Sequence, residues 1–317
     1  MKYRKLGKSG LVVSEIAYGS WLTFANQIEL DKAKKLLKKA FELGINYIDT
    51  ADVYERGKAE ELLGQVLPEY NRRQYIVATK TFWPMSDHQT DRGLSRKHII
   101  DSIDGSLERL KLKYVDIFYC HRYDLNTPLV ETVEAVEDVI RRGKAVYWGT
   151  SEWTAAQIEE AVTICEDRGW HKPVVNQPLY NLLNRGIEHK ILPVCKQYGM
   201  GTCNFSPLAQ GVLTGKYSGG KIPKGSRGSN DKQNMWMKEQ IHDIPLLDKI
   251  DSMTEIAEKY GITLAQLSLA WILHRPDISS VIVGATTNSQ LESNAAASGI
   301  RIDNDDYKKM SALFPAP

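Results

Sequence analysis

Eight short apolar segments recur along this chain, and a stretch with helical spacing of its apolar residues follows each of them. The segments are rich in β-branched and aromatic residues, which is typical of buried strands. We predict strands over Ile16–Trp21, Ile45–Asp49, Tyr75–Lys80, Val115–His121, Ala145–Ser151, Val174–Gln177, Gly201–Ser206 and Ser280–Ala285. Eight strand–helix units predict an α/β fold in which a parallel sheet closes into a (β/α)8 TIM barrel.

The segments between these strands repeat their apolar residues every three or four positions. In Asp31–Gly44 this spacing gives one apolar face, and Gly44 is a residue that can end the helix. Further helices are predicted within or close to Lys58–Leu67, Arg96–Leu110, Val130–Arg142, Ala155–Arg168, Ile187–Tyr198, Leu246–Tyr260, Thr263–Leu273 and Ser289–Gly299.

An open, doubly wound sheet would alternate strands and helices in the same way. Such a sheet, when it binds a dinucleotide, normally carries G-x-G-x-x-G after its first strand. Here the first predicted strand ends in Gly19-Ser20-Trp21, without that motif. The sequence therefore favours the closed barrel.

Two segments lie outside the repeat. Residues 1–14 contain two short extended runs around Gly7-Lys8-Ser9-Gly10, which predicts a β-hairpin across one end of the barrel. The connection after the seventh strand, from Leu208 to about Asp243, is rich in glycine and is long for a compact domain. Because it carries Lys216, Lys221, Lys224 and Arg227, we expect it to form a flap over an anionic ligand. The sequence offers no linker, so residues 1–317 are expected to form a single domain.

Composition excludes several classes of protein. The net charge is only +2 over 317 residues, which gives no support for a nucleic-acid partner or an anionic membrane surface. The longest apolar run, Leu267–Leu273, is too short for membrane insertion, and the charged N-terminus does not resemble a signal peptide. The 4 cysteines are scattered without a C-x-x-C pair, as expected of reduced thiols in a cytoplasmic protein.

Polar residues occupy the ends of consecutive predicted strands. Asp49, Lys80 and His121 end the second, third and fourth strands, and Tyr54 follows Asp49 closely. In this kind of barrel the carboxyl ends of the strands carry the active site. Each residue alone has an ordinary structural explanation, such as a helix cap, a solvated strand end or core packing. Four titratable groups at neighbouring positions on one rim make coincidence a poor explanation.

These four side chains suit one kind of chemistry. A free tyrosine has a pKa near about 10, and a nearby buried ammonium lowers it. Lys80 is the candidate for that ammonium, and Asp49 would keep it protonated. His121 would then orient a substrate oxygen, which suits hydride transfer to a carbonyl carbon while Tyr54 donates a proton.

Other active-site chemistries fit less well. The sequence has no H-E-x-x-H or paired Cys/His spacing, so no metal site is expected. Gly211–Tyr217 differs from a phosphate loop in its glycine spacing and in the tyrosine after its lysine. There is no G-x-S-x-G hydrolase motif, and a glycosidase would need a second carboxylate beside Asp49 at the strand ends.

The segments INYIDTADVY, ATK and VDIFYCHRYD closely resemble the aldo-keto reductase superfamily, and the similarity covers nearly the whole chain. GTSEW, NQPLYNLLNR, SPLAQGVLTGKY and GATTNSQLESN look most like its branch of voltage-gated potassium channel β-subunits and their relatives. The resemblance implies a barrel that binds NADP(H) across its rim, with Asp49, Tyr54, Lys80 and His121 as the catalytic set.

The resemblance also implies the residues that bind the cofactor. Ser151 and Gln177 match positions that hold the nicotinamide carboxamide, and Phe205 matches the aromatic that stacks on its ring. The full cofactor set implied is Trp21, Ser151, Glu152, Gln177, Phe205, Ser206, Leu208, Gln210, Lys216, Arg227, Gly284, Thr286, Gln290 and Asn294.

Two residues depart from the pattern of the superfamily. Many members carry Asn at Glu152, and many carry Arg at Gln290, against the 2′-phosphate. The channel-related branch also lacks that Arg, so NADP is expected, with Lys216 and Arg227 as compensating cations, and NAD remains an alternative.

The expected function is NADP(H)-dependent reduction of a small-molecule aldehyde or ketone. Trp21, Trp83, His121 and Tyr123 are the candidates to line the substrate pocket, although Trp83 and Tyr123 suit core or rim packing equally well. The alternative is a redox-sensing regulatory β-subunit of a potassium channel. His121 favours the enzyme, because channel subunits of this type often carry Asn there. The resemblance also leaves a homo-oligomer open, since relatives of this branch often assemble.

Overall fold

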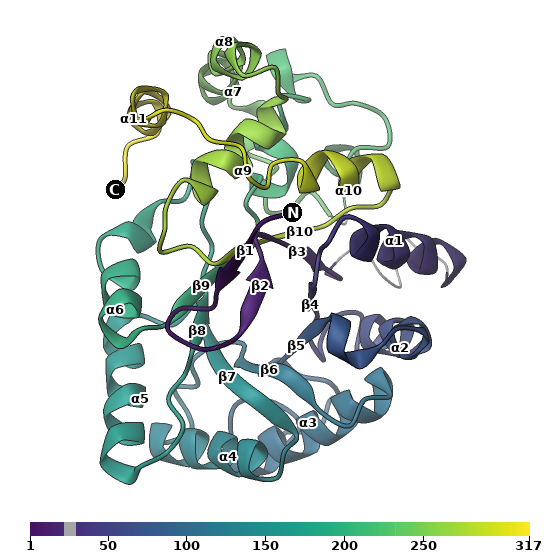
Figure 1. Cartoon of the computed structure of the whole chain (residues 1–317), viewed down its shortest axis with the longest axis vertical. Helices are drawn as coiled ribbons and strands as arrows, with labels where there is room; N and C mark the ends of the chain where they lie inside the picture. The colour runs from purple at the N-terminus through teal and green to yellow at the C-terminus, as the bar shows by residue number, and fades with distance from the viewer. Residues whose placement is uncertain (22–29, 232) are drawn as a thin grey trace.

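The computed structural model describes residues 1–21, 30–231 and 233–317. Parallel strands form a closed barrel in the order β10-β3-β4-β5-β6-β7-β8-β9, and the helices lie outside this ring (Figure 1). The strands are β3 (Ile16–Gly19), β4 (Tyr47–Asp49), β5 (Ile76–Thr81), β6 (Val115–Cys120), β7 (Ala145–Ser151), β8 (Val175–Gln177), β9 (Gly201–Asn204) and β10 (Ser280–Val283). The predicted (β/α)8 barrel is confirmed.

Most helices follow the predicted positions. The α-helices are α1 (Leu30–Glu42), α2 (Lys58–Val66), α3 (Arg96–Leu110), α4 (Leu129–Arg141), α5 (Ala155–Arg168), α6 (Ile191–Tyr198), α7 (Ile244–Asp251), α8 (Thr254–Lys259), α9 (Leu264–Leu273), α10 (Asn288–Ala295) and α11 (Asn304–Leu313). The helix expected near Leu246–Tyr260 is divided, because Ser252 and Met253 form a turn between α7 and α8. The sequence did not predict α11, which follows the last strand–helix unit.

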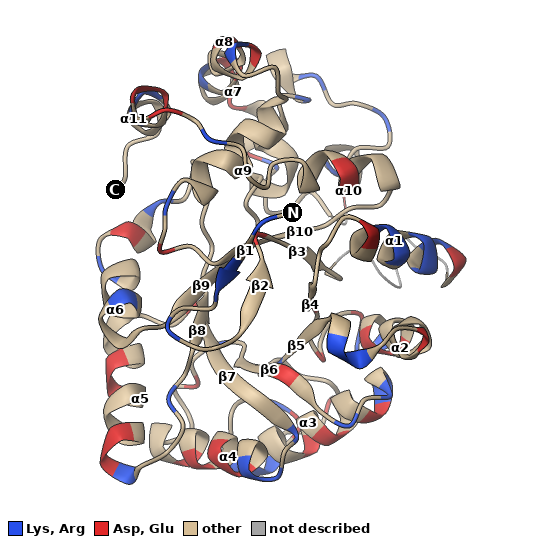
Figure 2. Cartoon of the chain, in the orientation of Figure 1, with Lys and Arg blue, Asp and Glu red and all other residues tan. Residues whose placement is uncertain are grey.

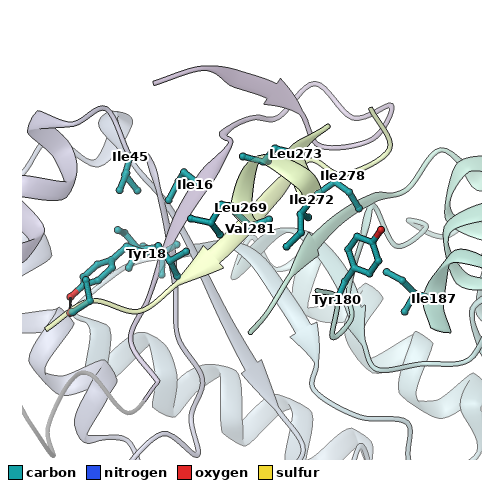
Figure 3. Close-up of a cluster of buried hydrophobic side chains, with 14 of the residues drawn as sticks. Ile16, Tyr18, Ile45, Tyr180, Ile187, Leu269, Ile272, Leu273, Ile278 and Val281 are labelled. Carbon is teal, nitrogen blue, oxygen red and sulfur yellow. Dashed lines mark hydrogen bonds between the residues drawn. The ribbon is translucent and has the colours of Figure 1, made fainter. Parts of the chain in front are cut away.

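The main hydrophobic core lies between the barrel and the helices. Figure 3 shows Leu269 and Ile272 of α9 beside Ile16 of β3 and Val281 of β10, and all four side chains are fully buried. Burial of one such side chain stabilises a fold by about 1.5–3 kcal/mol. This layer fixes the strands, and therefore the residues at their ends.

The predicted N-terminal hairpin is confirmed, and it closes the amino end of the barrel. Strands β1 (Tyr3–Lys5) and β2 (Val12–Ser14) pair antiparallel and lie across the ring of strands in Figure 1. Leu6 and Val13 pack with the side chains that fill the barrel interior. Gly7 has φ +59°, and a Cβ there would lie 2.3 Å from the Gly199 carbonyl oxygen. The turn therefore requires glycine at this position.

Arg4 links the hairpin to the last strand–helix unit. Its guanidinium donates to the carbonyl oxygens of Leu273, Arg275 and Ile278 at 2.5–2.8 Å. It also pairs with the buried Glu15 at 2.8 Å. The two ends of the chain are thus joined at the amino end of the barrel.

The long connection after β9 is folded into short turns. It contains the 3-10 segments η4 (Ala209–Thr214), η5 (Ser218–Gly220), η6 (Arg227–Ser229) and η7 (Gln240–His242). Tyr217 is fully buried, and its hydroxyl accepts a hydrogen bond of 3.0 Å from the Gly228 amide. A Cβ at Gly228 would approach the Tyr217 ring to 2.8 Å, so the two segments lie in close contact.

Charged residues of both signs are distributed over the outer helices, whereas the barrel strands carry few (Figure 2). Within the described part of the chain, no helix has the length and apolar character needed to cross a bilayer.

Candidate active site

A cavity opens at the carboxyl end of the barrel, opposite the hairpin. Its volume is about 1710 Å³. Ligand pockets are usually about 300–1000 Å³, so this one has room for a dinucleotide and a small substrate together. The predicted site residues that line it are Trp21, Asp49, Tyr54, Trp83, His121, Ser151, Glu152, Gln177, Phe205, Ser206, Leu208, Gln210, Lys216, Arg227, Gly284, Thr286, Gln290 and Asn294.

Lys80 lies beneath the floor of this cavity and connects two of the predicted residues. Its ammonium is fully buried and donates to Asp49 Oδ2 at 2.7 Å and to the Thr50 carbonyl oxygen at 2.7 Å. It also lies 3.1 Å from the hydroxyl of Tyr54. The other oxygen of Asp49 accepts from Gln177 Nε2 at 2.8 Å. The structure therefore brings Asp49, Lys80 and Tyr54 into one hydrogen-bonded chain.

A strained turn after β4 presents Tyr54 to the cavity. Glu55 and Arg56 have φ +51° and +52°, which are uncommon for residues with a Cβ. Asp52 stabilises the turn, since its side-chain oxygens accept from the Val53 amide at 2.6 Å and from the Ser102 hydroxyl at 2.8 Å. Backbone strain of this kind persists only where surrounding contacts enforce it.

The electrostatics of this chain differ from the expectation in one respect. Burial raises the pKa of Tyr54, and the nearby Lys80 ammonium opposes that rise without reversing it. For Lys80, burial lowers the pKa, but Asp49 and Tyr54 together outweigh it and the pKa lies above its ordinary value. The phenol is thus a neutral proton donor beside a charged ammonium, and the expected fall in its pKa is not found.

His121 lies beside Tyr54, with its ring edge-on to the phenol at a centroid distance of 6.0 Å. Burial, Lys80 and Arg122 place the pKa of His121 well below its ordinary value, so the imidazole is neutral. The Trp83 ring also lies edge-on to the imidazole, at a centroid distance of 6.4 Å. A neutral imidazole can donate one hydrogen bond without adding charge to the site.

A second polar group lies deeper in the barrel, below Asp49 and Gln177. The hydroxyls of Tyr47 and Tyr119 are 2.9 Å apart and fully buried. Both hydroxyls lower the pKa of the Cys203 thiol, but burial outweighs them, so this pKa lies above its ordinary value. This group could not be predicted from the sequence, because residues within a strand give no signal that their polar tips meet inside the barrel.

The long connection after β9 places polar groups on the cavity wall. Gln210 Oε1 and Ser226 Oγ are buried without a hydrogen-bond partner among the described residues. Arg227 is partly buried, and burial lowers its pKa. Unpartnered buried polar atoms beside a cation are suited to a polar, anionic ligand. These residues fit the expected cofactor.

Gln290 and Glu152, which depart from the pattern of the superfamily, both bind neighbouring loops. Gln290 Oε1 accepts from the Thr286 amide at 2.8 Å, at the start of α10. Glu152 has φ +57°, and its carboxylate accepts from the Leu179 amide at 2.6 Å. Both side chains reach the cavity while they hold the backbone around it.

Trp83 and Tyr123 were both candidates to line the substrate pocket, and the structure places them differently. Trp83 lines the cavity and is 39% exposed. Tyr123 is outside the cavity lining, because its ring packs edge-on against the buried Trp153 at 5.0 Å. Tyr123 therefore packs at the rim instead of facing the substrate space.

Several residues of the cavity wall were not predicted from the sequence, and two of them have large side chains that face the site. Arg122 follows His121 directly, and that position alone could have drawn attention to it. Trp236 comes from the long connection after β9 and is 66% exposed although it lines the cavity. Among the described residues, no group of three or more His, Cys, Asp or Glu side chains could hold a metal ion.

Comparison with known proteins agrees with this geometry. A model of the aldo/keto reductase family, whose reactions are oxidoreductions with a nicotinamide cofactor, matches residues 15–314. A probable voltage-gated potassium channel subunit beta of Oryza sativa subsp. japonica is 45% identical over 301 residues, covering 94% of this chain and 91% of the relative. The protein of the same name from Arabidopsis thaliana is 44% identical over 301 residues, with the same coverage. The chain belongs to the aldo/keto reductase family.

Proposed function

We propose that the protein is an NADP(H)-dependent oxidoreductase that reduces aldehydes or ketones to alcohols. The observation that carries this proposal is the hydrogen-bonded chain of Asp49, Lys80 and Tyr54 beside a neutral His121. Asp49, Tyr54 and His121 line the cavity above Lys80, where one carbonyl oxygen could reach both the phenol and the imidazole.

Each of the four residues has a distinct role in the proposed reaction. A nicotinamide cofactor held by the cavity residues would supply the hydride for the carbonyl carbon. The Tyr54 hydroxyl gives its proton to the carbonyl oxygen, and the Lys80 ammonium stabilises the phenolate that remains. Asp49 holds Lys80 in its charged form, and the His121 N–H orients the carbonyl oxygen. Solvent then returns a proton to Tyr54.

The preference for NADP over NAD rests on the cations of the long connection. Lys216 and Arg227 line the same cavity as Gln290. At the position of Gln290, many members of the superfamily carry an Arg that binds the 2′-phosphate. Two cations on this wall favour the cofactor that carries the additional phosphate. Fluorescence titration with NADPH and NADH tests this, and tighter binding of NADH would contradict it.

Tyr54→Phe is the direct test of the reaction. The ring stays and only the proton donor is removed, so turnover of an aromatic aldehyde should fall by about 100-fold or more. The affinity for NADPH, measured by fluorescence, should stay close to that of the wild type. Reduction at the wild-type rate by this variant would contradict the role assigned to Tyr54.

The names of the relatives favour a second function, that of a redox-sensing regulatory subunit of a potassium channel. A pull-down with the tetramerisation domain of such a channel tests it, with the cofactor present. Absence of binding at micromolar protein concentration would count against a channel partner. The same purified protein, examined by light scattering, would show whether it forms a homo-oligomer.

The remaining proposals concern organisation and compartment. We regard residues 1–317 as a single functional domain in the cytoplasm. The free, buried state of Cys120, Cys165, Cys195 and Cys203 suits a reducing compartment.

A further inference from the structure

The cavity wall carries a cation that the proposed reaction does not use. Arg122 lines the cavity beside His121, and its guanidinium lies 5.7 Å from the centre of the Trp83 ring. Its Nη1 donates to the His121 carbonyl oxygen at 2.6 Å. This bond and the tryptophan face hold the guanidinium in a fixed position at the substrate end of the site.

Arg122 has no full counter-charge among the residues that the structure describes. No carboxylate of the described residues lies within the 4.0 Å of an ion pair with it. Burial lowers the pKa of Arg122, and Glu152 is the acidic side chain whose charge opposes that fall. This side chain is exposed, and its carboxylate already accepts a hydrogen bond from the Leu179 amide. Partly buried cations are normally paired, so this guanidinium is ready to bind an anion.

The position of Arg122 separates it from the phosphates of the cofactor. Arg122 follows β6, which lies on the opposite side of the ring from β10. Lys216 and Arg227 belong to the connection after β9, beside β10. The charge of Arg122 instead opposes the rise in the pKa of Tyr54 and contributes to the low pKa of His121. An anion bound by Arg122 would therefore belong to the molecule whose carbonyl is reduced.

We infer that Arg122 selects carbonyl substrates that carry a carboxylate. This inference rests on the proposed reductase function and specifies its substrate class. The carbonyl oxygen would lie at Tyr54 and His121, and the carboxylate would accept hydrogen bonds from the Arg122 guanidinium. The aromatic rings of Trp21 and Trp83 line the same cavity and suit an apolar spacer between the two groups.

The test compares two substrates of nearly equal shape. 4-Carboxybenzaldehyde and 3-carboxybenzaldehyde are each assayed against their methyl esters, and the ratio of kcat/KM for acid over ester is the readout. A charge-assisted bond should make this ratio about tenfold higher in the wild type than in Arg122→Met. Any general effect of the substitution on Tyr54 cancels in the ratio. Equal ratios in the two proteins would overturn the inference.

Two further variants separate charge from folding. Arg122→Lys keeps the charge and should retain part of the preference for the acids. Arg168→Met is the matched control, since that guanidinium also lies over a tryptophan, 6.0 Å from Trp170, but on the exposed side of α5. It should leave the ratio unchanged.

Binding of benzoate and benzamide, measured by calorimetry on the protein with NADP+, needs no turnover. Benzoate should bind the wild type about tenfold more tightly than Arg122→Met, while benzamide should not distinguish them. If the wild type binds benzoate in this way but reduces no carbonyl, the reductase proposal fails and the anion site stands. If the esters are reduced and benzoate does not discriminate, the reductase stands and the anion site fails.

Discussion

The two ends of the barrel differ in how closely their residues pack. At the carboxyl end, charged side chains meet a large cavity, and the loops hold residues with positive φ, namely Glu55, Arg56, Glu152, Ser206, Ala209 and Gln210. At the amino end, the hairpin packs backbone against backbone, with Gly7 in contact with Gly199 and Gly201. Six of the 7 non-glycine residues with positive φ in the described part of the chain therefore lie at the end that carries the cavity, whereas the amino end is closely packed.

The largest effect is expected at the carboxyl end, from Lys80→Met. This substitution removes the ammonium that stabilises the Tyr54 phenolate, so kcat should fall by about 100- to 10,000-fold. The assay is reduction of an aromatic aldehyde, with NADPH binding and circular dichroism showing that the variant is folded. Lys172→Met is the control, because its pair with Glu166 is exposed and contributes little. If kcat of Lys80→Met were within tenfold of the wild type, the roles assigned to Lys80 and Tyr54 would be contradicted.

The amino end should show the reverse behaviour. In Gly7→Val, the side chain would overlap the backbone near Gly199 and would have to adopt φ +59°. We expect a loss of about 2–5 kcal/mol in the free energy of unfolding, with kcat per folded molecule unchanged. Urea titration measures the loss.

Gly10→Ala is the matched control for Gly7→Val within the same hairpin turn. No atom lies within 4 Å of the Cβ that it would add, so the free energy of unfolding should change by less than about 0.5 kcal/mol. Equal stability of the Gly7 and Gly10 variants would show that the amino end is not closely packed. A fall in kcat for the Gly7 variant would show that the two ends are coupled.

A further expected effect, on the pH dependence of stability, concerns the turn that carries Tyr54. Burial, followed by the charge of Glu60, raises the pKa of Asp52 to about 7. The native state therefore holds a proton that the unfolded state releases near its ordinary pKa of about 4. The free energy of unfolding should fall as the pH rises from about 4 to 7.

Asp52→Asn should remove this contribution. The amide keeps the size of the side chain without an ionisable group, so the pH dependence of the variant should be flatter between pH 4 and 7. Unfolding titrations at several pH values measure both slopes. Parallel curves for the wild type and the variant would mean that Asp52 does not titrate in this range.

Much of the fold could be predicted from local pattern alone. Strand β7 has the predicted limits Ala145–Ser151, because its apolar run ends sharply at polar residues. The first barrel strand ends at Gly19, two residues before the predicted limit of Trp21, since backbone pairing and not residue type decides where a strand ends. Helix α11 lies beyond the repeating unit, so the alternation of strands and helices could not indicate it.

The site was only partly predictable, for a physical reason. The strand-end rule identified Asp49, Lys80 and His121, because parallel strands bring their last residues to one rim. Whether the pKa of Tyr54 is raised or lowered depends on the balance between burial and nearby charge. The sequence alone does not give this balance. The position of Arg122 over Trp83 likewise depends on how two loops meet.

The bonds of Arg4 affect the order in which the chain can fold. Arg4 is synthesised 269–274 residues before the carbonyl groups that it binds, which belong to Leu273, Arg275 and Ile278. Contacts that span 269–274 residues form slowly, because a long loop must close first. The hairpin is therefore synthesised well before it can reach these native contacts.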